Sequence, residues 1–161
     1  MKAINESANQ LKEIMLQGMF ANFKKDGSVA SVFFFLKENQ PCLSLIPPEF
    51  LSSHEGKVMF SQLLREISND PRVTAVGLIY EAYMACTENG SQLGKLLDSG
   101  NLRVADLKTK QDVIVMLFDT PEREEAFIFP VDIKNRTIGE RFNMPDGVIN
   151  GLFANLFKDA A

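Results

Sequence analysis

The chain has 161 residues, of which 45% are hydrophobic and 24% charged, so its size and composition are those of one globular domain and exclude wholesale disorder. Its formal net charge of −4 provides no excess of cations, so binding to nucleic acid or to an anionic membrane is not expected. No apolar run approaches the roughly 20 residues of a membrane span, and charged residues interrupt 1–15 in a way atypical of a secretion signal. Cys42 and Cys86 lie in apolar stretches, as free thiols in a reducing compartment do, so we expect a cytoplasmic protein.

The first predicted element is a helix. Ser7 with Gln10 is typical of a capping box at its start, and Gly27 is placed to end it. The apolar face repeats with the helical period and indicates packing against a sheet. That face comprises Ala8, Leu11, Met15, Gly18, Met19 and Asn22, widened by Ile14 and Phe23.

A hairpin is predicted next, with strands at 29–36 and 42–46 and a short loop at 37–41. If the turn centres on Asn39, Phe33 lies opposite Leu45 and Phe35 lies opposite Leu43. The residues between these phenylalanines are also apolar, so both faces of the hairpin are expected to need cover.

Pro47 and Pro48 end that hairpin, and a second helix follows in which Ser52 and Glu55 form a capping box. Residues 69–71, Asn-Asp-Pro, stop it. The stretch 73–86 is then apolar at both odd and even positions, which predicts a central strand covered on both faces. Within it, Glu81 breaks the apolar pattern.

The remainder begins with an irregular stretch at 87–110, where a short helix at 91–97 is predicted and where the length of the connection favours a functional or mobile segment. A second hairpin is predicted from strands 112–119 and 126–133 around a turn at 121–124. Its expected register places Val113, Val115 and Leu117 on one face with Phe127, Phe129 and Val131. A short strand at 137–142 and an amphipathic helix starting near Pro145 complete the chain.

Together these elements predict a single α+β domain spanning 1–161. Its core is an antiparallel sheet of about five strands, made of two hairpins plus a central strand, covered by three main helices.

Several motifs of catalysis and cofactor binding are missing from the sequence. It has no glycine-rich phosphate loop, no dinucleotide fingerprint, no HExxH and no CxxC, so no cofactor is expected. The single histidine, His54, stands at a helix start, where a solvated residue is the ordinary interpretation and a catalytic one the minority interpretation. These observations favour a protein that is not an enzyme.

Glu81 is the first candidate for a site, because a carboxylate in an apolar strand must be paired, hydrogen-bonded, protonated or placed at a cavity. The ordinary interpretation is a bond to a lysine, an arginine or a backbone group under a loop. The alternative is a role facing a ligand or a metal ion.

The second hairpin supplies the other candidate. Its expected register sets Asp112 opposite Asp132, with Lys134 on the same face as Asp132. Like charges directly opposite each other are unfavourable unless a cation lies between them. An acid facing D-x-K resembles the pattern of metal-dependent nucleases, although Gln111 precedes the acid where proline is typical.

The run VTAVGLIYEAYM at 73–84 resembles a group of uncharacterised bacterial and phage conserved proteins. Their hallmark is a long strand ending in an E-A-[WY]-M-like stretch, followed by a charged segment and another strand. Here Glu81-Ala82-Tyr83-Met84 matches, and Lys110-Gln111-Asp112 matches the charged segment loosely, without its proline and arginine. The resemblance covers 73–140 and implies an α+β fold and a bacterial or phage origin, but no activity.

Two functional hypotheses follow. The first is a small cytoplasmic binding, interaction or regulatory protein, expected to form a homodimer, that contacts a protein or small molecule near Glu81 and the 87–110 stretch. The second is a metal-dependent hydrolase or nuclease-like enzyme using carboxylates on strands. The candidate site residues are Glu81, Tyr83, Lys110, Asp112, Asp132 and Lys134.

Overall fold

The computed structural model describes residues 2–84 and 110–142. The irregular stretch expected at 87–110 and the helix expected from Pro145 lie outside the described residues. The elements in chain order are α1 (Lys2–Asp26), β1 (Val32–Lys37), β2 (Gln40–Leu45), α2 (Glu49–Ser52), α3 (His54–Asn69), β3 (Val73–Met84), β4 (Gln111–Asp119), β5 (Glu124–Asp132) and β6 (Thr137–Ile138).

The strands form one antiparallel sheet in the order β2-β1-β3-β4-β5-β6. The predicted α+β class and antiparallel sheet are therefore confirmed, with six strands in place of about five. β3 lies between β1 and β4, as the apolar character of both its faces predicted. The additional strand, β6, is a two-residue strand within the stretch expected to add a short one.

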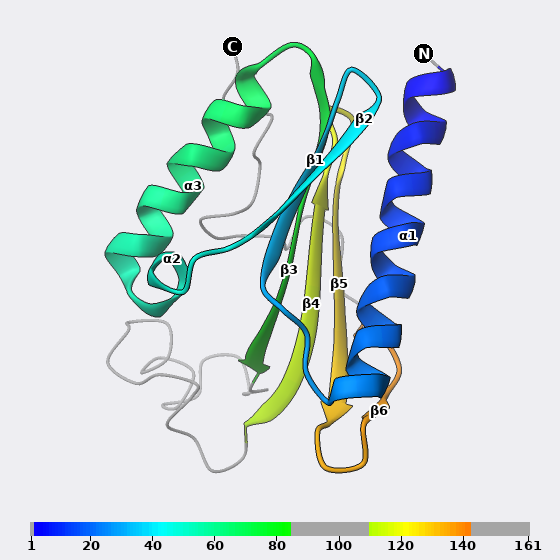
Figure 1. Cartoon of the computed structure of the whole chain (residues 1–161), viewed down its shortest axis with the longest axis vertical. Helices are drawn as coiled ribbons and strands as arrows, with labels where there is room; N and C mark the ends of the chain where they lie inside the picture. Colours follow the sequence, from blue (N-terminus) through cyan, green and yellow to red (C-terminus); the bar gives the residue numbers. More distant parts are fainter. Residues whose placement is uncertain (1, 85–109, 143–161) are drawn as a thin grey trace, which may run out of the picture.

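Helices cover the two faces of the sheet separately, with α1 on one side and the α2-α3 pair on the other (Figure 1). Alternate residues of the strands face the two layers, so one sheet contributes to two hydrophobic cores. The α1 core includes Met19, Phe23, Phe34, Ile114, Met116 and Phe118. The α3 core includes Ile46, Phe60, Leu64, Val73, Val76 and Leu78.

The two helices predicted within the described residues are present, but their starts differ from expectation. α1 begins at Lys2, so Ser7 lies inside it and caps nothing, whereas Gly27 ends the helix in the left-handed conformation at φ 73° as expected. Ser53 caps α3 by accepting a hydrogen bond from the Gly56 N–H at 3.0 Å, so the expected cap at Ser52 is displaced by one residue. Two consecutive serines precede the helix and either can cap it, so the sequence does not show which of them does.

The register of the first hairpin differs from expectation by one residue. Its turn consists of Glu38 and Asn39, both at positive φ, as in a two-residue hairpin turn of type I′. The observed pairs are Phe33 with Ser44 and Phe35 with Cys42; the expected pairs with Leu45 and Leu43 are wrong. Because side chains alternate between faces, Leu43 and Leu45 lie on the opposite face of the sheet from Phe33 and Phe35.

The second hairpin shows the same kind of shift. Val113 pairs with Pro130 and Ile114 with Phe129, so the predicted common face of Val113 with Phe129 is wrong. Phe127, Phe129 and Val131 instead share the α1 face with the even-numbered residues of β4. The turn closes between Thr120 and Arg123, where the Thr120 N–H donates to the Arg123 carbonyl at 2.9 Å.

Tyr80 packs against the α3 core, and burial raises the pKa of its phenol to about 12. An unfolded tyrosine ionises near pH 10. Between about pH 10 and 12 the unfolded chain therefore holds fewer protons than the folded one, so stability should fall as pH rises, by about 3 kcal/mol in total. Urea denaturation at pH 9 to about 12 measures this slope, and the Tyr80→Phe variant should lack this component of it.

Within the described part of the chain, no helix combines the length and the apolar character needed to cross a membrane.

Candidate functional site

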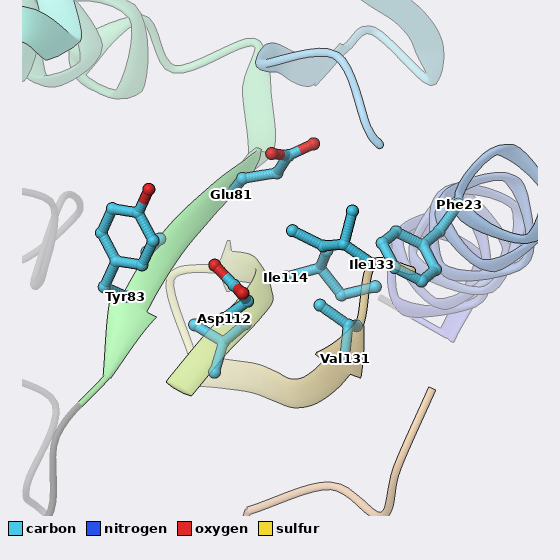
Figure 2. A pocket seen from close by; sticks show the side chains of 9 residues that line it. Phe23, Glu81, Tyr83, Asp112, Ile114, Val131 and Ile133 are labelled. Carbon is cyan, nitrogen blue, oxygen red and sulfur yellow. The ribbon is translucent and has the colours of Figure 1, made fainter. Parts of the chain in front are cut away.

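A pocket of about 240 Å³ opens where β3 ends and β4 begins, on the side of the sheet that α1 covers. Antiparallel pairing brings the last residues of β3 and the first of β4 to the same end of the sheet. Figure 2 shows carboxylates and a tyrosine on the two strands, with a group of apolar side chains beside them. The lining residues are Phe23, Glu81, Ala82, Tyr83, Asp112, Val113, Ile114, Val131 and Ile133.

Glu81 reaches this pocket from the last third of β3, where the strand extends past the buried core and the residue is exposed. Its Oε1 accepts a hydrogen bond from the Val29 N–H at 2.7 Å, in the connection between α1 and β1. The expected bond to a backbone group is therefore present, and so is the expected cavity. The ordinary interpretation of Glu81 is therefore confirmed, whereas a role facing a ligand or a metal ion stays a prediction. A carboxylate with two oxygens can hold a backbone N–H and line a pocket at once.

Asp112 enters the same pocket from the start of β4. It lies opposite Tyr83, and Glu81 lies opposite Ile114, so the two carboxylates are diagonal neighbours on one face of the β3-β4 pair. Asp112 is partly buried. Among the described residues, no hydrogen bond or ion pair engages its carboxylate. This partly buried carboxylate is thus available to a cation.

Tyr83 lines one side of the pocket, and Lys110, which is not a lining residue, contacts its ring. Tyr83 is 47% exposed. The Lys110 ammonium lies 4.4 Å from the centre of the Tyr83 ring, in the geometry of a cation–π contact. Tyr83 and Lys110, which were both site candidates from the sequence, are therefore neighbours in space.

The other side of the pocket is apolar and comes from elements far apart in the chain. Phe23 is a buried residue of the last turn of α1, and Ile114 and Val131 are buried on β4 and β5. Ile133 follows β5 and is 46% exposed. An ammonium group with a short hydrocarbon arm therefore finds carboxylate oxygens and apolar carbon within one small volume.

Asp132 and Lys134 are not part of this arrangement. Because Val113 pairs with Pro130, the neighbour of Asp112 across the hairpin is Val131, whose carbonyl accepts a hydrogen bond from the Gln111 side chain at 3.2 Å. The predicted pairing of Asp112 with Asp132 is therefore wrong, because a shift of one residue moves Asp132 to the opposite face.

Asp132 instead organises the turn that follows β5. It accepts hydrogen bonds from the Asn135 backbone N–H at 3.1 Å and from the Asn135 side chain at 2.8 Å. These bonds lower the pKa of the Asp132 carboxyl from its usual value. Lys134 is exposed within the same turn. Asp132 therefore has a local structural role, as polar residues at strand ends commonly do.

The other candidate residues do not come together in a second site within the described part of the chain. His54 is the exposed first residue of α3. Among the described residues, no three histidine, cysteine or acidic side chains are grouped so that they could hold a metal ion. A second hollow, of about 260 Å³, lies between the start of α1 and the β4-β5 turn. Its Glu125 already forms ion pairs with Arg123 at 3.1 Å and with Lys12 at 3.2 Å. Unlike the carboxylate of Asp112, that of Glu125 therefore has cationic partners.

No protein-family model matches the chain, and comparisons with curated proteins and with solved structures gave no match either. The geometry of the pocket therefore carries the functional argument alone.

Sequence reasoning identified the polar half of the pocket and missed the apolar half. Phe23 was expected on the buried face of the first helix, but nothing in its spacing connects it to residues of β4. Val131 and Ile133 were expected to lie on a strand. Their contribution depends on how α1 crosses the sheet, which is a tertiary property that periodicity does not encode.

Proposed function

We propose that this protein is a non-enzymatic binding protein whose pocket at the β3-β4 end takes a small organic cation with an apolar arm. The observation that carries the proposal is the Asp112 carboxylate, which is partly buried in a pocket and has no partner among the described residues. Removing a carboxylate from water without a counterion is costly, so a cationic ligand compensates that cost.

The composition of the pocket defines the ligand further. Ligand sites combine an apolar lining with a few placed polar groups, and this pocket has Phe23, Ile114 and Val131 beside two carboxylates. One oxygen of Glu81 is held by the Val29 N–H, so the second oxygen and both oxygens of Asp112 can accept from an ammonium group. A volume of about 240 Å³ is below the range of drug-sized sites, which favours a ligand of few heavy atoms.

The test uses n-butylammonium, with 1-butanol and butyrate as neutral and anionic probes of the same length. Backbone amide shifts in ¹H–¹⁵N spectra report binding, and a ligand this small should bind with Kd of about 1–10 mM. We expect shifts at Glu81, Tyr83, Asp112 and Ile114 with butylammonium, much weaker ones with butanol and none with butyrate.

Asp112→Asn should weaken butylammonium binding about tenfold, which corresponds to about 1.4 kcal/mol. Asp132→Asn is the matched control, because it removes an equal charge from the other face of the hairpin and should leave binding unchanged. Equal binding by the Asp112→Asn variant and the unmodified protein, or equal binding of butanol and butylammonium, would contradict the proposal.

The hydrolase hypothesis is the less favoured alternative. It uses the carboxylates of Glu81, Asp112 and Asp132 together with Lys134. The register of β4 with β5, however, puts Asp132 on the other face from Asp112. Mg²⁺ or Mn²⁺ titration followed by melting temperature still separates the two ideas. A rise that is lost in Asp112→Asn would favour the enzyme.

The cytoplasmic location is part of the same proposal, and the free thiol of Cys42 supports it. Fractionation of the producing cells tests it directly.

A further inference from the structure

The strand β2 forms one edge of the sheet, and its outer side is open in the described part of the chain. It is six residues long, and apart from Cys42, which is partly buried, its residues are exposed. The opposite edge, β6, has two residues. β2 is therefore the longer stretch of unpaired backbone among the two edges.

The hairpin geometry fixes which backbone groups of β2 face outward. Lys37 and Gln40 flank the two-residue turn and form a hydrogen-bonded pair, as such turns require. Farther along, the Ile46 N–H donates to the Ser31 carbonyl at 2.8 Å. Even-numbered residues of β2 thus bond to β1, so the backbone N–H and C=O groups of the odd-numbered residues point to the open edge.

The outward-facing residues are Pro41, Leu43 and Leu45. Proline has no N–H to donate, and its position on the open side of an edge strand is the one where this matters least for the sheet. Leu43 and Leu45 each offer one donor and one acceptor. Their side chains are 63% and 67% exposed and lie on the same face of the strand.

The usual devices that keep an edge strand from pairing are weak here. Natural proteins place charged side chains, bulges or covering loops on open edges. The sequence of β2, QPCLSL, carries no charge, and its pairing with β1 runs without a bulge through all six residues. Proline alone shortens the stretch that can pair.

We propose that β2 pairs in antiparallel fashion with β2 of a second copy of this chain, with Leu43 opposite the partner's Leu43. In this register the two Leu43 residues exchange N–H to carbonyl bonds. Each Leu45 N–H donates to the carbonyl of the partner's Pro41, so the missing N–H of proline leaves no outward donor unmatched. Leu43 meets the partner's Leu43, and Leu45 meets the partner's Pro41, on one face.

Charge and area support a second copy as the occupant. An uncharged edge gives a charged peptide nothing to recognise, whereas β2 itself is an uncharged extended strand of matching length. Two six-residue strands bury less than the roughly 1,200 Å² of stable interfaces, so we infer a weak dimer with Kd in the micromolar range or above. Each copy carries a net charge of −4, so screening by salt should strengthen the dimer.

The test is sedimentation velocity of the full chain over a concentration series from about 5 μM to 1 mM, spanning the inferred Kd. We expect the average mass to rise from monomer toward dimer and to rise further at high salt. Leu43→Lys should weaken the dimer at least tenfold, because it brings two ammonium groups together at the two-fold axis. Ile14→Lys is the matched control, since Ile14 is 66% exposed and belongs to α1, not to the paired strand.

Circular dichroism melting checks that each variant is folded, and Leu43→Pro gives a second route if the lysine variant is not. That variant removes an outward N–H and leaves the bonds to β1 intact. A monomer at every concentration, equal weakening by Ile14→Lys, or an unchanged dimer in both Leu43 variants would overturn the proposal. So would a monomer that binds an uncharged extended peptide from another protein in place of its own copy.

Discussion

Replacing Gly77 with alanine should destabilise the protein by about 3 kcal/mol, near the upper end of overpacking effects. Gly77 lies on β3 directly between Phe34 of β1 and Phe118 of β4, whose rings stack with centres 6.2 Å apart. A Cβ at Gly77 would lie 2.8 Å from Cε1 of the Phe34 ring and closer still to two other ring atoms. Phe34 is 1% exposed, so its ring has no free space to move into.

Urea denaturation gives the free energy of unfolding for this variant and for a double variant, Phe34→Leu/Gly77→Ala. The smaller side chain should relieve the clash. The double variant should therefore lose about 1–3 kcal/mol less stability than the sum of the two single substitutions. Gly18→Ala is the matched control. Nothing lies within 4 Å of a Cβ at Gly18, and alanine in helix α1 should stabilise by about 1 kcal/mol. Equal stability of the Gly77→Ala and unmodified proteins would show that the Phe34 ring does not occupy this space.

Glu125→Gln should cost about 3 kcal/mol, because it removes the partner of a buried cation. Lys12 of α1 has a side chain only 11% exposed, and its Nζ lies 3.2 Å and 3.4 Å from the two carboxylate oxygens of Glu125 on β5. The ammonium also lies 5.9 Å from the centre of the Phe127 ring, which cannot replace a counterion.

Lys12→Met should cost less, about 1 kcal/mol or below, because it removes the buried charge and keeps the apolar length of the side chain. Glu125 would still be paired with Arg123 at 3.1 Å. The exposed Glu122→Gln serves as control and should change stability by less than about 0.5 kcal/mol. Urea denaturation of all three variants at neutral pH measures the difference between the costs of Glu125→Gln and Lys12→Met. An equal cost for Lys12→Met and Glu125→Gln would contradict it.

The order of elements within the described residues followed from the sequence with small errors. The change from a period of 3.6 to a period of 2, the Gly27 stop and the Pro47-Pro48 break are local signals, and each appears in the structure where it was expected. Helix starts were less well predicted. Ser7 and Gln10 have the residue types of a capping box, but Ser7 lies inside α1, because the five residues before it are also helical.

Strand register was the main failure, and it has a simple physical cause. Both hairpins were expected one residue away from the observed pairing, and a shift of one residue exchanges the two faces. In this chain most strand positions are apolar on both faces, so hydrophobic alternation does not select one register. The left-handed backbone of Glu38 and Asn39 selects it in the first hairpin.

The candidate site was predicted in part for the same reason. Glu81 could be found from one strand alone, since a carboxylate in an apolar run needs an explanation wherever the strand pairs. Asp112 was found as a residue but assigned the wrong neighbour. Its place beside Glu81 depends on the pairing of β3 with β4, two strands separated by more than twenty residues of chain.

The sequence alone determined the class of this protein: one antiparallel sheet with apolar faces on both sides, a central strand at β3 and amphipathic helices to cover it. These features depend on composition and local period, which the chain carries residue by residue. Tertiary structure decided which residues meet: Glu81 with Asp112, Asp132 with its own turn, and Leu43 with the open edge. Each of these depends on a strand register or a helix crossing that is fixed by packing between distant segments. The strands are apolar on both faces, so the sequence alone does not select between two registers that differ by one residue.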